Sequence, residues 1–290
     1  MDPCSSAATV AVAPFSSALT LAPADPGVYR AELPRGWTVG GGKLHGGFLL
    51  ALLTKAGLAG LAAHPVPHAV QDGGRLGIEP VAVSAEFLRA PEVGPVELAT
   101  EVLKVGRTVS AVRVALRQHG RAAMVGTVTA GQLPEDPPSW SDLPTMAAEP
   151  PPGAPLTSDG PGRLPPMAHA CQVVLDPATA SFTRGERGTP LLRGWVRPVG
   201  EAPDVLFTLV AGDILPPLLF NLGRLGWAPT VQLTALLRGR PAPGWLRLEA
   251  ASRTVRGDWL DEDYTVIDAE GRLVCQARQL ALAPLDRPKS

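Results

Sequence analysis

The strongest constraint in this chain is a repeated order of segments: a long apolar stretch, then a group of alternating, strand-like stretches. The apolar stretches cover residues 44–62 in the first half and 205–222 in the second. Four strand candidates follow each of them, at residues 81–88, 96–105, 108–118 and 122–132, and at residues 230–237, 246–255, 259–268 and 273–282. Alternating polarity is typical of strands, and close spacing favours antiparallel pairing. The repeat therefore predicts two similar units that close one sheet between them.

The apolar stretch at residues 44–62 predicts a buried helix. Most of its residues favour helix, and apolar side chains occur on nearly all sides, as in a helix that a sheet wraps around. The second stretch contains Pro216 and Pro217, and proline inside a helix removes a hydrogen bond and clashes with the preceding turn. We therefore expect the second central helix to begin late or to be kinked, and we place it at residues 214–222.

Prolines divide the chain into parts. They cluster between residues 134 and 166, where apolar residues show no period, which indicates an extended linker. The sequence thus predicts an N-terminal tail at 1–27, a first domain at 28–133, the linker at 134–166 and a second domain at 167–290.

Composition excludes several classes of function. A net charge of −1 gives no electrostatic basis for binding nucleic acid or anionic membranes. The three cysteines, Cys4, Cys171 and Cys275, show no Cys-x-x-Cys spacing, which argues against a zinc site and a disulfide framework. The N-terminus lacks the basic start of a secretion signal, and Lys55 interrupts the longest apolar stretch. We expect a cytoplasmic protein without a metal ion and without membrane or nucleic-acid partners.

Short motifs in a common order add a family resemblance. They are His45-Gly46-Gly47, Phe87-Leu88-Arg89-Ala90-Pro91, Gly106-Arg107-Thr108, Thr230-Val231-Gln232-Leu233-Thr234 and Gly271-Arg272-Leu273-Val274. In these the chain resembles bacterial acyl-CoA thioesterase II and related thioesterase-like double-hotdog proteins. The resemblance implies an α+β fold, a double hotdog with two long central helices wrapped by one continuous antiparallel sheet. It also implies a homo-oligomer.

The same resemblance implies a chemistry: hydrolysis of fatty acyl-CoA to free fatty acid and CoA by an activated water, with no cofactor. Carried over by position, the catalytic residues fall on Asp213, Thr230 and Gln279. Thr234 stays open as an alternative to Thr230, because residues four apart in a regular strand point to the same face.

Two further assignments concern the start of the first helix. Backbone N–H groups around Gly46 and Gly47 are candidates for binding the substrate oxyanion, because glycine allows close approach and helix N-termini favour negative charge. We expect His45 to line the same substrate-binding cleft, with a catalytic role as the alternative.

Asp213 also has a structural alternative, as the N-cap of a helix beginning at Ile214.

The sequence also bears on three other functions. The chain has no Gly-x-Ser-x-Gly elbow, which argues against a serine hydrolase. The stretch beginning Gly212-Asp213 resembles the hydratase motif Gly-Asp-x-Asn-Pro-x-His, but Leu215 and Leu218 stand at its asparagine and histidine positions. An enoyl-CoA hydratase-like enzyme is thus disfavoured, while a non-catalytic acyl-thioester-binding protein stays open.

Overall fold

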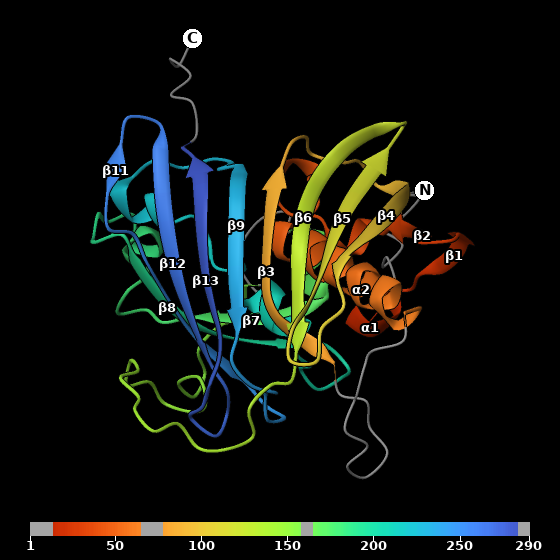
Figure 1. The fold of residues 1–290 in the computed structure, drawn as a ribbon. Coiled ribbons are helices and arrows are strands. Elements are labelled where there is room, and N and C mark those ends of the chain that lie inside the picture. The colour runs from red at the N-terminus through yellow and green to blue at the C-terminus, as the bar shows by residue number, and fades with distance from the viewer. Residues whose placement is uncertain (1–13, 65–77, 158–164, 284–290) are drawn as a thin grey trace, which may run out of the picture.

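The main feature of the computed structural model, which describes residues 14–64, 78–157 and 165–283, is one antiparallel sheet of thirteen strands (Figure 1). The first half contributes β1 (Ala22–Asp25), β2 (Val28–Leu33), β3 (Glu79–Phe87), β4 (Gly94–Lys104), β5 (Ser110–Gln118) and β6 (Arg121–Gly131). The second half contributes β7 (Cys171–Leu175), β8 (Leu191–Pro198), β9 (Thr230–Leu237), β10 (Leu246–Ala251), β11 (Val255–Arg256), β12 (Trp259–Ile267) and β13 (Leu273–Leu282).

The order of the strands confirms the duplication and the continuous sheet. The order is β1-β2-β4-β5-β6-β3-β9-β13-β12-β10-β8-β7, with β11 paired to β12. The halves join at β3 and β9, where Ala82 lies opposite Leu236 and Glu86 opposite Gln232. Outward from this seam, β3-β6-β5-β4-β2 on one side corresponds to β9-β13-β12-β10-β8 on the other. Each unit therefore has the same topology, although sequence alternation did not reveal its first strand, β2 or β8.

The first central helix is confirmed as α2, Gly46–Ala62, and it packs against strands β3 to β6 (Figure 1). Its side chains are buried on nearly every side, from Phe48 to Leu61. Two glycines allow close contact with the sheet: a Cβ at Gly57 would lie 2.9 Å from Val128 Cγ2, and one at Gly60 would lie 2.5 Å from Thr100 Oγ1.

The expectation of a second long central helix is wrong. In its place are the short helix α3, Phe207–Ala211, and a 3-10 turn at Leu218–Leu222, with irregular chain between them. Pro216 and Pro217 explain the break, because they have no N–H to donate and force the preceding residue away from helical conformation. The third α-helix of the described residues is α1, Phe15–Ala18, and none of the three is long and apolar enough to cross a membrane.

Residues outside the two predicted domains also pack against the core. Phe15 in α1 contacts Trp37 and Phe207, with ring centroids 5.4 and 5.2 Å apart, so the end of the predicted tail joins both halves. In the proline-rich linker, the carbonyl of Ala147 accepts a hydrogen bond of 2.9 Å from Trp195 Nε1. The described part of the linker therefore lies along the second half instead of standing free.

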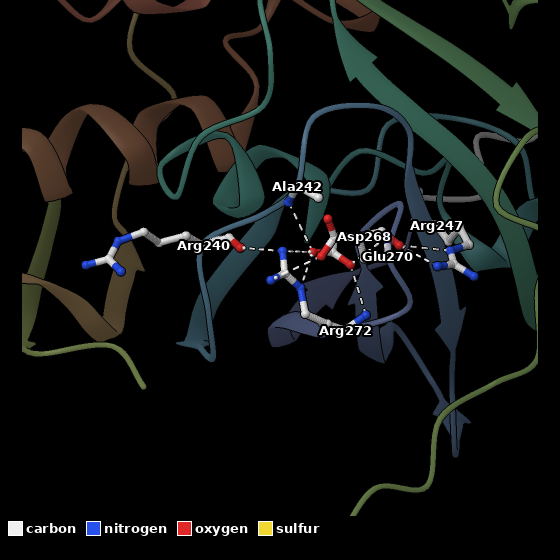
Figure 2. A network of polar contacts seen from close by, with 6 residues as sticks. All are labelled: Arg240, Ala242, Arg247, Asp268, Glu270 and Arg272. Carbon is white, nitrogen blue, oxygen red and sulfur yellow. Dashed lines mark hydrogen bonds and ion pairs between the residues drawn. The ribbon is translucent and has the colours of Figure 1, made fainter. Parts of the chain in front are cut away.

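A buried acid organises the turn between β12 and β13 (Figure 2). Asp268 is fully buried and accepts hydrogen bonds from the N–H groups of Ala242, Glu270 and Arg272 and from the Arg272 guanidinium. Arg272 also donates to the carbonyl of Arg240, whose own guanidinium pairs with Glu79 in β3 and Glu135 in the linker. The network ties the far end of the second unit to the first unit and to the linker.

Candidate active site

A cavity of about 860 Å³ lies between the start of α2, the chain after α3 and the inner faces of β9, β12 and β13. Its walls are mainly apolar, with Leu44, Leu49, Phe87, Met167, Val173 and Leu215 among them. All the predicted site residues except Gly47 line it directly: His45, Gly46, Asp213, Thr230 and Gln279. Both halves of the duplicated chain thus contribute to one chamber.

Asp213 lies in this cavity against the N-terminus of α2. Its Oδ2 accepts a hydrogen bond of 2.6 Å from the N–H of Gly47, one of the first-turn donors that have no partner inside a helix. The segment that follows Asp213 is not an α-helix. The alternative role of Asp213, as the N-cap of a helix beginning at Ile214, is therefore wrong. Burial raises the pKa of the Asp213 carboxyl from 3.8 to about 7, and the Gly47 hydrogen bond offsets part of the rise. A carboxylate with this pKa can accept a proton near neutral pH.

His45 has both ring nitrogens engaged in the structure. Its Nδ1 accepts a hydrogen bond of 3.2 Å from the N–H of Phe48, which caps α2, so the ring proton is on Nε2. That Nε2–H donates to the backbone carbonyl of Asp213 at 3.0 Å. Burial lowers the pKa of the imidazole from 6.5 to about 4, and the hydrogen bond to Asp213 offsets part of the fall. His45 is a neutral cap that fixes the backbone of Asp213.

Gly46 and Gly47 are required by the close approach of these two segments. A Cβ at Gly46 would lie 2.7 Å from Asp213 Oδ2, and one at Gly47 would lie 2.6 Å from the carbonyl oxygen of Leu209. Real Cβ atoms do not come that near, so each position admits only glycine without movement. The helix N-terminus can therefore contact Asp213 directly.

Thr230 and Gln279 form a hydrogen-bonded pair that also lines the cavity. Thr230 Oγ1 donates to Gln279 Oε1 at 2.8 Å, and the Gln279 side chain is only 6% exposed. The pairing of β9 with β13 shifts here, because Ala281 lies opposite Thr230 whereas Leu280 lies opposite Gln232. Val231 is thus an extra residue in β9, a β-bulge, and it brings Thr230 onto the face that carries Gln279.

Thr234 lies on the other face of the sheet. Its hydroxyl is hydrogen-bonded to Ser84 Oγ at 2.8 Å and to Gln232 Nε2 at 2.8 Å. The expectation that residues 230 and 234 share a face assumed a regular strand, which the bulge at Val231 interrupts. Of the two threonines, only Thr230 reaches the cavity.

Glu262 in β12 is a cavity residue that the sequence reasoning missed. It lies directly opposite Gln279 and accepts a hydrogen bond of 2.5 Å from Gln279 Nε2. Its Oε1 accepts another of 2.8 Å from the N–H of Leu218. Burial raises the pKa of its carboxyl to about 7 against these hydrogen bonds, and the nearby charge of Asp213 adds to the rise. One signal was available: Glu262 is an acid at an inward position of β12, between the buried Leu260 and Tyr264.

The cavity therefore combines two buried carboxylates with a threonine–glutamine pair. Such a set can orient a water, remove one of its protons and stabilise charge without a redox group. Among residues 14–64, 78–157 and 165–283, no cluster of three or more His, Cys, Asp or Glu side chains could hold a metal ion.

Two family models match consecutive parts of the chain. The acyl-CoA thioesterase N-terminal domain matches residues 33–131, and the acyl-CoA thioesterase C-terminal domain matches residues 135–283. The two matched ranges together cover most of the chain and correspond to its two units.

Individual proteins are similar over almost the whole length. An uncharacterized protein of Mycobacterium tuberculosis is 40% identical, over 93% of this chain and 98% of its own. The structure of a proposed thioesterase II from Thermobifida fusca has a TM-score of 0.79 at 32% identity, covering 94% of this chain and 98% of that one. A hot dog fold protein from Alicyclobacillus acidocaldarius has a TM-score of 0.74 at 20% identity, with the same coverage. The hotdog fold expected from the sequence is thereby confirmed.

Proposed function

The chain belongs to the acyl-CoA thioesterase family, and we propose that it hydrolyses fatty acyl-CoA to a free fatty acid and CoA by means of an activated water. The observation that carries the proposal is Asp213, a buried carboxylate with a pKa of about 7 that lines the same largely apolar cavity as Thr230 and Gln279. A base with this pKa is matched to proton removal near neutral pH.

The proposed reaction has two steps. Asp213 takes a proton from the water, whose oxygen attacks the thioester carbonyl carbon and forms a tetrahedral oxyanion. The oxyanion then collapses, the carbon–sulfur bond breaks, and the protonated Asp213 returns its proton to the CoA thiolate. The products are the fatty acid and CoA with its free thiol, and Asp213 is again a carboxylate.

In this mechanism the oxyanion is bound at the start of α2. The N–H of Gly47 is already engaged by Asp213, so we assign the role to the N–H of Gly46, which lines the cavity. First-turn N–H groups lack intrahelical partners and lie at the positive end of the helix dipole. His45 supports the site as the cap of the same helix and takes no proton.

We propose acyl chains of medium to long length, because apolar side chains form most of the cavity wall. A homo-oligomer that associates through the sheet is part of the same proposal. The duplicated chain already corresponds to the dimer of a single-unit relative, and the family resemblance implies further association.

A panel of saturated acyl-CoAs, followed by the release of free thiol, tests the function. Thiol release that is fastest with medium or long chains is the expected result. Tight binding without release would instead support an acyl-thioester-binding protein. Addition of water to crotonyl-CoA would instead support a hydratase. The structure disfavours this outcome, because both ring nitrogens of His45, the histidine beside Asp213, are already hydrogen-bonded to the backbone and do not supply a second acid or base.

A further inference from the structure

We propose that Glu262 is a positioning residue that fixes the direction of the hydrogen bonds from Thr230 through Gln279, and thereby makes Thr230 an acceptor for the attacking water. The proposal rests on the proposed function and adds to it a residue outside the aspartate, threonine and glutamine that the family resemblance implies.

The direction of these hydrogen bonds follows from the chemistry of Glu262, the last group in the series. Above its pKa of about 7 the Glu262 carboxylate can only accept hydrogen bonds, so it requires the NH₂ of Gln279 to face it, at 2.5 Å. The amide oxygen of Gln279 then faces Thr230 and accepts the threonine hydrogen at 2.8 Å. Because a hydroxyl has one hydrogen, the lone pairs of Thr230 are left to accept from a water in the cavity.

This direction orients the water for attack. Asp213 and Thr230 are then both acceptors, so a water between them directs its two hydrogens toward them. Both lone pairs of that water stay free, and one of them can face the thioester carbon. With the opposite direction, Thr230 would donate to one of these lone pairs, withdraw electron density from the attacking oxygen, and leave one water hydrogen without its acceptor.

Glu262 is itself held firmly enough for this task. Its side chain is 2% exposed, and the N–H of Leu218 donates to Oε1. Its position opposite Gln279 in the β12–β13 ladder fixes the separation of the two side chains. The carboxylate also lies 3.5 Å from the hydroxyl of Tyr264, so three polar contacts hold it in a largely apolar setting, in the direction that orients Gln279.

The variant Glu262→Gln tests the proposal because it preserves the shape of the side chain while it reverses the direction of the hydrogen bonds. The oxygen of the new amide can still accept from Leu218, and its NH₂ would face Gln279. The Gln279 amide must then turn over, and Thr230 becomes a donor to water. Measured above the pKa of Glu262, kcat should fall about 10–100-fold, the effect of losing the hydrogen bond from the water to Thr230, with KM nearly unchanged. Glu249→Gln is the matched control, because Glu249 in β10 pairs with Arg193 and does not line the cavity.

Combination with Thr230→Val separates orientation from general damage. If Glu262 acts through the threonine, Glu262→Gln should lower kcat less than about twofold in the Thr230→Val background, because the two act as one unit. A full additional loss in that background, or a wild-type kcat in folded Glu262→Gln, would overturn the proposal.

A nuclear magnetic resonance measurement decides the point without turnover. In the wild-type protein the Gln279 side-chain amide, identified by its disappearance in Gln279→Met, should show one proton shifted strongly downfield by the carboxylate. The shift should be lost in Glu262→Gln. Ordinary glutamine shifts in the wild type would refute the role of Glu262 even if the protein proves to be a thioesterase. If no acyl-CoA is hydrolysed, the proposed function fails, but the amide shift still reports on Glu262.

Discussion

Replacing Gly46 with alanine should separate the chemistry of Asp213 from the stability of the fold. The new Cβ would lie 2.7 Å from Asp213 Oδ2, which is the end of a side chain and can rotate away. The same change at Gly47 would bring Cβ to 2.6 Å from the backbone oxygen of Leu209, which cannot move without the chain. Gly46→Ala should therefore remain folded while the carboxylate of Asp213 leaves the N–H of Gly47.

The size of the effect follows from the hydrogen bond that is lost. The bond from Gly47 to Asp213 Oδ2 is 2.6 Å long and lowers the pKa of the carboxyl against the rise caused by burial. A hydrogen bond to a charged group contributes about 1.5–3 kcal/mol, and 1.36 kcal/mol corresponds to one pKa unit. Without it the pKa of Asp213 should rise from about 7 by about one to two units.

The assay is the pH profile of kcat/KM for thiol release from an acyl-CoA. The wild-type rate should rise with pH through an acid limb near 7, since the base form of Asp213 appears above its pKa and Glu262 ionises in the same range. In Gly46→Ala the limb should move to about pH 8–9. Gly239→Ala is the control, because its Cβ would have no heavy atom nearer than 3.8 Å. A folded Gly46→Ala whose limb coincides with that of the wild type would refute the reasoning.

Three other predictions address the remaining parts of the site and the assembly. Thr230→Val should lower kcat by about tenfold or more, the effect of one lost hydrogen bond. Thr234→Val, on the opposite face of the sheet, should leave kcat unchanged. Equal effects of the two variants in steady-state assays would contradict the β-bulge at Val231. His45→Asn keeps a helix N-cap but loses the bond to the Asp213 carbonyl, so kcat should fall while the melting temperature changes little; an abolished pH limb would instead indicate that His45 titrates in catalysis. Light scattering at micromolar concentration should give a mass above that of one chain, and a strictly monomeric mass would exclude the homo-oligomer.

Local patterns in the sequence were sufficient for most of the sheet and for α2. Strand β9 begins and ends where alternation placed it, at Thr230 and Leu237, and β13 likewise runs from Leu273 to Leu282. These strands have one face in the core, so their burial alternates as the apolar residues do.

The errors occur where tertiary contacts or single residues outweigh a pattern. The apolar stretch around Pro216 has helical composition, but two missing N–H groups prevent the second long helix. Thr230 and Thr234 lie on opposite faces because of one extra residue, Val231, which no period predicts. Glu262 received no role because its partner Gln279 becomes adjacent only through the pairing of β12 with β13.

The most direct test of the central claim, that Asp213 activates the water, is the kcat of Asp213→Asn. The amide oxygen can still accept from Gly47, so the shape of the site should persist without a base, and kcat should fall by roughly 10²–10⁴.

Stability provides the control in the same experiment. Because the pKa of Asp213 is raised from 3.8 to about 7 on folding, the wild type loses stability as pH rises through that range. Asp213→Asn carries no charge there, so its free energy of unfolding at pH 8 should be higher by up to about 4 kcal/mol. The account predicts an inactive variant that is at least as stable as the wild type. A folded Asp213→Asn that releases thiol at nearly the wild-type rate would contradict it.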